Sequence, residues 1–252
     1  MELSIVSFNI RCCDDPDGYS IAERAPRLSQ VIHAQNPDLI ALQEYRPAWE
    51  EHIASAFGGE YELFNKYRNE TVDVESSPIL WKKDAFSCEK TGWFWLSDTP
   101  ETESRGWDEL YNCYRMCVWA VLKHNASGRR FTFMNTHFGF GDNGQTASAR
   151  LISQYAQHIS DLPTFVCGDF NMNPASAGYA EMTRHFTDAN AVTARDWRAT
   201  YHAYGPKVSS DEHIDYCFTN DKITPKSVRI LDEKVGEKYP SDHFGLHILL
   251  EI

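Results

Sequence analysis

Hydrophobic and polar positions along the chain follow two kinds of pattern, one typical of buried strands and one typical of helices. Continuous apolar runs, as in strands that are covered on both faces, occur at residues 3–10, 38–44 and 165–170. Apolar residues at helical spacing predict helices at residues 24–35, 47–57 and 145–160. Pro26 fits the first turn of the first predicted helix. The pattern therefore favours a protein that combines strands and helices.

The remaining apolar segments predict further strands and one hairpin. Strands are expected at residues 77–83, 91–96, 213–220 and 243–252. Segments 118–124 and 129–137 flank a polar Asn-Ala-Ser-Gly turn, which is typical of a β-hairpin. Because hairpins stand between the helices, we expect mixed sheets with helices outside them, not a strict alternation of strand and crossover. No repeat or linker is visible, and a single domain over residues 1–252 is the simplest interpretation.

The charge balance is acidic and weighs against long nucleic acids as ligands. The chain is 42% hydrophobic, enough for a large core, and its 24 basic and 36 acidic residues give a formal net charge of −12. Basic residues occur in isolated pairs, such as Lys82-Lys83 and Arg129-Arg130, and not in rows that could contact successive phosphates. A phosphate ester is still compatible with this charge, because bound metal ions supply positive charge locally.

Cysteine usage and the lengths of the apolar runs indicate a reduced protein outside the membrane. Seven cysteines are present, an odd number, and none has the spacing of a metal finger. No charged and then apolar leader precedes the first predicted strand, and no apolar run approaches the ~20 residues of a membrane-spanning helix. The sequence thus predicts a cytoplasmic protein with no membrane association, and it shows no sign of an obligate protein partner.

Polar side chains gather where the predicted strands end. The segment VCGDFNMNP at 166–174 closes an apolar run with one carboxylate and two amides within a few residues. Comparable groups stand at other strand ends, namely Asn9, Glu44, Asp215 and the segments 135–137 and 241–243. Unpaired carboxylates and amides are costly to bury, and sites in layered α/β proteins form where strand ends meet loops. We therefore expect these groups to converge on one site.

The side-chain types at these ends favour a hard divalent cation. Asn9, Glu44 and Asp242 offer oxygen ligands, which suit one or two Mg²⁺ or Mn²⁺ ions, whereas zinc more often recruits histidine or cysteine. Mg²⁺ commonly accompanies phosphate substrates. The sequence therefore predicts a magnesium or manganese site.

The remaining groups suggest acid and base chemistry beside that cation. An imidazole next to an aspartate is held in one tautomer and stabilised when charged, and Asp215 with His243 is the candidate pair. Asp169 could position or deprotonate a water, and Asn171 could donate a hydrogen bond to an oxygen of a phosphoryl transition state. These four residues are therefore candidate catalytic residues.

Taken together, the motifs resemble the endonuclease/exonuclease/phosphatase superfamily, whose fold is that of pancreatic deoxyribonuclease. In chain order they are FNIR at 8–11, LQE at 42–44, NTH at 135–137, GDFN at 168–171, IDY at 214–216 and SDH at 241–243. The resemblance implies a four-layer α/β/β/α sandwich, in which two central mixed β-sheets pack face to face between outer helices. It also implies a hydrolase that acts on phosphoric ester bonds.

The resemblance assigns roles at the metal and at the water. It implies that Asn9 and Glu44 lie at the metal ion, with Asp242 near it. Asp169 and Asn171 would orient the nucleophilic water and the phosphate. These assignments agree with the ligand types at the strand ends.

The resemblance also implies roles for two histidines. His137 would contact the scissile phosphate, with Glu75 as its acidic partner, and Asp215 would pair with His243. Whether Asp169 or His243 acts as the general base stays open at this point.

Within the superfamily, the chain is most similar to a bacterial branch of uncertain substrate. The similarity lies in GWFWLSDTP at 92–100 and RGWD at 105–108, and it implies that Arg115 and His202 face the phosphate or the leaving group. Two positions depart from the pattern of relatives. The NTH motif continues as NTHFGFGD, without the usual aspartate and histidine, and His213 replaces an arginine before IDY. Both departures concern substrate contacts.

Three functions compete on this evidence. The first is a metal-dependent phosphoesterase that hydrolyses a small phosphodiester or phosphomonoester by in-line attack of an activated water. The second is a nuclease that acts on short or single-stranded nucleic acid. The third is an inactive binding module of the same fold, which would be marked by a missing metal ligand or histidine. None is missing here, and the acidic charge favours a small substrate over a nucleic acid.

Overall fold

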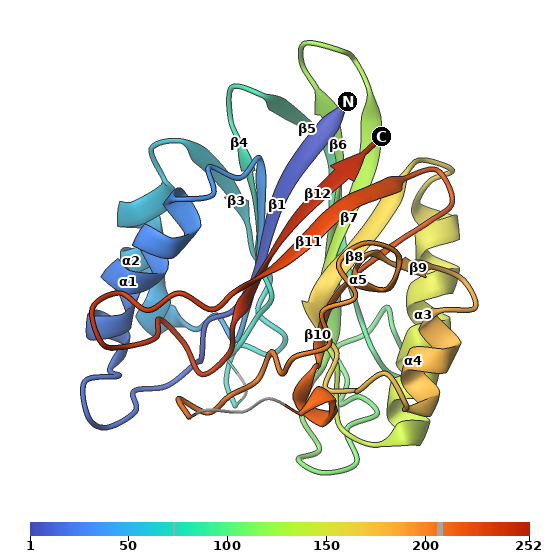
Figure 1. Cartoon of the computed structure of the whole chain (residues 1–252). Helices are drawn as coiled ribbons and strands as arrows, with labels where there is room; N and C mark the ends of the chain where they lie inside the picture. The colour runs from blue at the N-terminus through green and yellow to red at the C-terminus, as the bar shows by residue number, and fades with distance from the viewer. Residues whose placement is uncertain (73, 206–208) are drawn as a thin grey trace.

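The computed structural model describes residues 1–72, 74–205 and 209–252 and confirms the four-layer sandwich. Two mixed six-stranded sheets pack face to face, and helices cover the outer face of each (Figure 1). Within the described residues, no helix combines the length and apolarity needed to cross a membrane.

The first sheet is built around the earliest strand of the chain. Its strands, in spatial order, are β11 (Thr224–Leu231), β12 (Gly245–Glu251), β1 (Glu2–Asn9), β2 (Leu39–Gln43), β4 (Ile79–Lys82) and β3 (Tyr61–Phe64). Only the β1–β2 pair is parallel, and α1 (Ile21–His33) forms the crossover between these two strands. α1 and α2 (Pro47–Phe57) cover the outer face of this sheet (Figure 1).

The second sheet repeats this arrangement. Its strands, in spatial order, are β5 (Phe86–Trp95), β6 (Met116–His124), β7 (Arg130–His137), β8 (Thr164–Asp169), β10 (Asp215–Thr219) and β9 (Thr187–Asp188). The parallel pair is β7–β8, and its crossover is α3 (Asp142–Ile159). The shorter helices are α4 (Ala177–Met182), α5 (Ala189–Val192) and the 3₁₀ helix η1 (Ser210–Glu212).

Three layers of apolar side chains hold the sandwich together. The middle layer lies between the sheets and includes Phe133 and Phe165, whose ring centroids are 5.0 Å apart. Two outer layers pack each sheet against its own helices, through residues such as Trp49 in α2 and Ile152 in α3. Both faces of the central strands are therefore buried, which explains their continuous apolar runs.

Strand direction brings the polar strand ends to one edge of the sandwich. Parallel pairing places Asn9 beside Gln43 at the C-terminal ends of β1 and β2. It likewise places His137 beside Asp169 at the C-terminal ends of β7 and β8. Asp215 begins the neighbouring antiparallel strand directly opposite Asp169. Because the two sheets stack face to face, both sets of ends meet at the same edge, the lower one in Figure 1.

Some predicted elements begin elsewhere or were not expected. The first helix starts at Ile21, before the predicted start, because Ser20 and Glu23 form a reciprocal capping box ahead of the apolar positions. Pro26 consequently lies inside the helix and not in its first turn, contrary to the expectation from sequence. The sequence analysis did not predict β3, β9 and β11, which lie at sheet edges where one face is exposed.

Candidate active site

A cavity of about 570 Å³ opens where the strand ends of the two sheets meet. Its walls combine residues from the predicted motifs with residues from the loops that follow β1, β3 and β5. Residues from the segment that precedes β10 complete the wall. Glu44, His137, Asp169, Asn171 and His243 all line it. The expected convergence of distant polar groups is therefore present in the structure.

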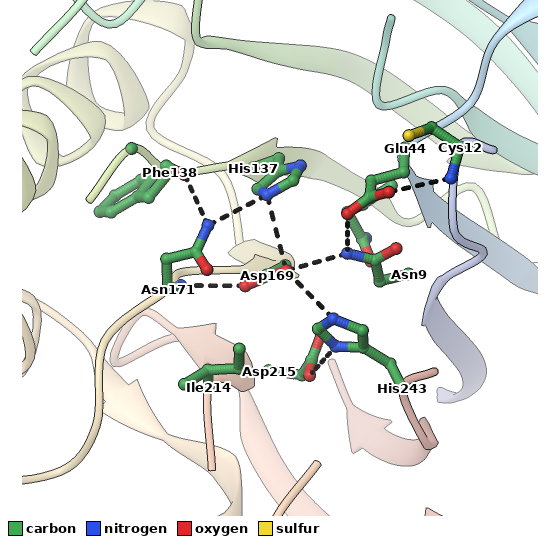
Figure 2. Close-up of polar contacts among 12 residues, drawn as sticks. Asn9, Cys12, Glu44, His137, Phe138, Asp169, Asn171, Ile214, Asp215 and His243 are labelled. Carbon is green, nitrogen blue, oxygen red and sulfur yellow. Dashed lines mark hydrogen bonds and ion pairs between the residues drawn. The ribbon is translucent and has the colours of Figure 1, made fainter. Parts of the chain in front are cut away.

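Asn9 joins the carboxylates of the two sheets. Its Nδ2 donates to Glu44 Oε1 at 3.1 Å and to Asp169 Oδ2 at 2.9 Å (Figure 2). Its Oδ1 accepts from the Arg11 backbone N–H at 3.0 Å. Glu44 Oε2 accepts a further hydrogen bond from the backbone N–H of Cys12 at 2.9 Å. The loop that follows β1 thus holds the Glu44 carboxylate in a fixed orientation.

Glu44 is ionised in this setting. Burial by itself would raise the pKa of Glu44, but the nearby His137 and the backbone N–H of Cys12 act in the opposite direction and lower it to about 2. The backbone of Glu44 adopts φ +62°, and Arg11 and Asn171 also have positive φ values, at +60° and +49°. Strained backbone at three residues around one cavity is typical of functional sites.

Asp169 is the central residue of the polar network. Its Oδ1 accepts from the backbone N–H of Asn171 at 2.9 Å, and its Oδ2 lies 3.5 Å from His137 Nε2 and 3.7 Å from His243 Nε2 (Figure 2). Burial raises the pKa of Asp169, and the neighbouring Asp215 adds to this shift. A carboxylate with a raised pKa is better suited to accept a proton than an ordinary aspartate.

Asp215 and His243 form the ion pair expected from sequence. His243 Nδ1 lies 2.9 Å from Asp215 Oδ2, and both side chains are buried. Burial lowers the pKa of His243, but the carboxylate of Asp215 outweighs this effect, and Asp169 adds to it, so that the pKa rises to about 10. At neutral pH the imidazole is therefore protonated and can act as a hydrogen-bond donor and positive charge.

His137 lies between the amide of Asn171 and the carboxylate of Glu75. The Asn171 amide Nδ2 lies 3.0 Å from its Nε2, and Glu75 Oε1 lies 3.6 Å from its Nδ1. Glu75 in turn forms a buried ion pair with Arg68 at 2.7 Å. Although burial opposes ionisation of Glu75, Arg68 outweighs it and lowers the pKa of this carboxyl. The structure thus places Glu75 beside His137, as the resemblance implies.

The donor set at the Glu44 side of the cavity fits a hard divalent cation. Asp242 also lines the cavity, and both burial and the charge of Glu44 raise the pKa of its carboxyl. The buried Asp242 carboxylate and the half-buried Glu44 carboxylate repel each other and would be stabilised by a cation, and oxygen ligands suit Mg²⁺ or Mn²⁺. The guanidinium of Arg11 provides partial compensation, since its Nε lies 3.7 Å from Asp242 Oδ2.

A second group of possible ligands is buried beside the cavity. Atoms of Asp169, Asp215 and His243 lie within 4.8 Å of one another, close enough to share a metal ion. In this group His243 Nδ1 is already paired with Asp215, so its positive charge offsets one of the carboxylates. The Glu44–Asp242 side has less internal compensation and is the better candidate for a cation.

The two residues expected to contact substrate occupy different surroundings. Arg115 lines the cavity and is held by Asp108, whose Oδ2 accepts from Arg115 Nε at 3.1 Å. His202 does not belong to the cavity wall. It is fully buried, with its ring stacked on Phe244 at 4.0 Å and edge-on to Tyr239 at 4.6 Å. The structure therefore brings Arg115 to the site and places His202 in the packing behind it.

Sequence reasoning missed several residues that the cavity brings together. Arg68, Tyr111 and Asp211 line the wall but lie in segments outside the polar strand ends that drew the prediction. Arg11 was visible only as a letter of the FNIR motif. No periodicity or spacing marks these residues, because tertiary packing of loops places them at the site.

The chain was compared with known families and structures. The profile of the Endonuclease/Exonuclease/phosphatase family matches residues 6–243, and a search of curated proteins gave no significant match. A mannosyl-6-phosphatase from Bacteroides thetaiotaomicron is 26% identical, with TM-score 0.89 and coverage of 99% of this chain and 100% of that one. A Bacteroides vulgatus endonuclease/exonuclease/phosphatase is 28% identical, with TM-score 0.87 and coverage of 100% and 99%.

More distant structures share the fold. TDP2 from D. rerio, in complex with a single-stranded DNA product, is 21% identical over 100% of this chain and 99% of that one, with TM-score 0.77. At this identity the similarity concerns architecture alone. The family match spans nearly the whole chain and includes every motif from which the site was predicted. The chain therefore belongs to the endonuclease/exonuclease/phosphatase family.

Proposed function

We propose that the protein is a divalent-cation-dependent phosphoesterase that hydrolyses a small phosphate ester, with a sugar phosphomonoester as the leading candidate. The observation that carries this proposal is the position of Asp169, which contacts Asn9 on the Glu44 side and lies beside His137 and His243. The similarity to a mannosyl-6-phosphatase over both full chains supports the substrate class.

The geometry supports a division of roles among the catalytic residues. Asp169 would accept a proton from the attacking water, since its raised pKa favours proton transfer. The protonated His243 would donate to a phosphoryl oxygen and would not act as the base. When a phosphate enters, the Asn171 amide would exchange its hydrogen bond to His137 Nε2 for one to a phosphoryl oxygen and stabilise the charge of the transition state, and His137 would contact the phosphate beside it.

The bond changes are those of hydrolysis. The water oxygen bonds to phosphorus as Asp169 takes the water proton, and the opposite P–O ester bond breaks. The leaving oxygen departs with the electron pair and takes a proton from solvent to become an alcohol, and Asp169 returns the proton of the attacking water to solvent. A divalent cation held by Glu44 and Asp242, beside Asn9, would supply Lewis-acid stabilisation of the phosphate and leaving-oxygen charge when bound.

A substrate screen with the purified protein tests the proposal. We expect turnover of phosphate monoesters in the presence of Mn²⁺ or Mg²⁺ and loss of turnover in EDTA, measured by phosphate release. The panel includes hexose phosphates and p-nitrophenyl phosphate, bis-p-nitrophenyl phosphate followed by p-nitrophenol release, and short DNA and RNA followed by gel electrophoresis. Turnover confined to oligonucleotides would support the nuclease function instead, and no turnover of any ester would support an inactive module. Activity that persists unchanged in EDTA would contradict the dependence on a cation.

A further inference from the structure

We propose that the cavity binds the leaving group of its substrate as a sugar ring, which lies against Tyr111 and Phe140 and donates hydroxyl hydrogen bonds to Asp211 and Glu212. The inference rests on the proposed phosphoesterase function and adds the side chains that would select the substrate. None of these four residues belongs to the catalytic network described above, yet all of them line the same cavity.

The aromatic part of this wall is exposed to an unusual degree. Tyr111 is 62% exposed, and its neighbour Leu110 is equally exposed at 62%. The Tyr111 ring meets the half-buried Phe140 ring edge to face, with centroids 5.4 Å apart and an interplanar angle of 77°. Large apolar side chains that remain exposed beside a polar cavity are typical of ligand-binding surfaces. The apolar C–H face of a sugar ring packs well on such rings.

The loop that carries Tyr111 is held in place before any ligand binds. Asp108 Oδ1 accepts from the backbone N–H groups of Leu110 at 3.1 Å and of Tyr111 at 2.8 Å. Asp108 Oδ2 accepts from Arg115 Nε and Nη2, at 3.1 and 3.0 Å. One buried carboxylate therefore positions both the exposed ring and the arginine of the cavity wall.

The turn that carries Phe140 is fixed against the same loop. The backbone N–H of Glu109 donates to the Phe140 carbonyl oxygen at 2.9 Å. A Cβ atom at position 139 would lie 2.8 Å from Asp108 Cα, so only glycine allows this close approach. Gly139 and Phe140 follow the NTH motif within the segment NTHFGFGD. Gly139 thus allows the turn that carries Phe140 to dock on the Asp108 loop.

The polar part of the wall suits a neutral, hydroxyl-rich group. Asp211 and Glu212 come from η1, and the Glu212 carbonyl oxygen accepts from the backbone N–H groups of Thr200 and Tyr201 at 2.9 and 3.0 Å. Tyr201 in turn bridges to His243, which ties this segment to the catalytic pair. Carboxylates accept hydrogen bonds from hydroxyl groups and repel the further phosphates of a polynucleotide.

Arg115 adds an independent sign that a ligand binds here. The residue is 4% exposed, and within the described residues its Nη1 has no hydrogen-bond partner. A buried guanidinium nitrogen without a partner is costly unless a ligand provides an acceptor. A phosphate oxygen or a sugar hydroxyl would complete its hydrogen bonds while Asp108 holds the other side of the group.

The test compares two phosphomonoesters that differ in the leaving group, mannose 6-phosphate and n-propyl phosphate. For Tyr111→Ala we expect KM for mannose 6-phosphate to rise by about tenfold more than KM for propyl phosphate, with kcat little affected, because the lost contact is with the bound leaving group. Tyr111→Phe, which keeps the ring, should stay close to wild type. Asp211→Asn should lower kcat/KM for the sugar ester more than for propyl phosphate. Trp93→Ala, an exposed aromatic outside the cavity, is the matched control.

The outcomes separate this inference from the proposed function. Equal effects of Tyr111→Ala on both esters, or a wild-type enzyme without preference for mannose 6-phosphate over propyl phosphate, would overturn the inference and leave the phosphoesterase intact. A Tyr111→Ala loss that appears with a short oligonucleotide and not with the sugar ester would overturn it in favour of a nucleobase platform. Failure of the wild type on both esters and on p-nitrophenyl phosphate would overturn the proposed function together with the inference.

Discussion

Asp169 shows how a single side chain can connect two halves of a site. It is the last residue of β8, accepts a hydrogen bond from Asn9 of the other sheet, and lies beside two histidines. Its burial is complete, so every contact it makes is shielded from bulk water. A group in such a position has a larger effect on catalysis than on the stability of the fold.

At this scale we expect Asp169→Asn to lower kcat by about 10²–10⁴-fold, the range for loss of a general base. The amide keeps the shape of the side chain but cannot take the proton of the attacking water. Steady-state kinetics on the best ester of the substrate screen provide the measurement, with thermal unfolding to show that the fold survives. The exposed Asp221→Asn serves as the control. A variant with near-normal kcat would remove Asp169 from the role of base.

The residues that were predictable from sequence are those that end a buried strand. Asn9, Glu44 and Asp215 could be found because a polar group after an apolar run is conspicuous, and the parallel strand order then predicts that such ends meet. Arg68 and Tyr111 could not, because each lies in a loop whose path depends on tertiary contacts. His202, which the resemblance placed at the substrate, lies in the packing behind the cavity wall, and its role stays a prediction.

Among the helices and loops, α1 provides the clearest link between packing and the site. Arg24 lies in α1 with no exposed surface, and its guanidinium donates to backbone carbonyl oxygens of Ile10, Arg11, Cys13 and Tyr19. This loop contains the Cys12 N–H that holds Glu44. By pattern Arg24 is an ordinary polar position of an amphipathic helix, so sequence alone gives no sign of its role.

We expect Arg24→Met to lower the free energy of unfolding by about 3 kcal/mol, because several buried carbonyl oxygens lose a charged donor. The loop should also loosen, so the affinity for Mn²⁺ should fall although Arg24 is not a metal ligand. Urea unfolding and calorimetric titration with Mn²⁺ measure the two effects. Arg229→Met, at an exposed ion pair with Glu233, should change neither beyond the small value of a surface pair. Unaltered Mn²⁺ affinity in Arg24→Met would show that the loop does not depend on this anchor.

Element types were predictable to the extent that each element is buried on a regular face. The central strands and α3 follow the predicted patterns closely. Both faces of the strands are buried, and α3 buries one stripe of its surface. Edge strands such as β3 and β11 escaped prediction because their exposed residues interrupt the apolar pattern. The start of α1 was missed because its first turn is defined by a capping box and not by apolar spacing.

For the molecule as a whole, the cavity carries more carboxylates than its arginines can balance, on a chain whose net charge is −12. A cation should therefore stabilise the folded protein. We expect the Tm to be higher with Mg²⁺ or Mn²⁺ than in EDTA. At 100 times its Kd, the ion should add about 2.7 kcal/mol to the free energy of unfolding. Differential scanning fluorimetry across an ion titration gives the measurement.

Glu44→Gln should remove most of this rise in Tm, because it takes away one of the two carboxylates that face the cation. Glu51→Gln, on the exposed face of α2, is the matched control and should retain it. An identical ion-dependent shift in both variants would place the cation away from Glu44. The test needs no substrate, so it separates cation binding from the choice of ester.

The pairing of β1 with β12 has a consequence for the order in which the site is assembled. Asn9 ends the first strand, whereas Asp242 and His243 directly precede the last strand, and the Ser241 hydroxyl donates to the Asn9 carbonyl oxygen across 232 positions of sequence. Asn9 and Glu44 can therefore be joined by the Asp242 carboxylate and the His243 imidazole only when β12 pairs with β1. The proposed cation and imidazole sites are complete only once this non-local pairing has formed.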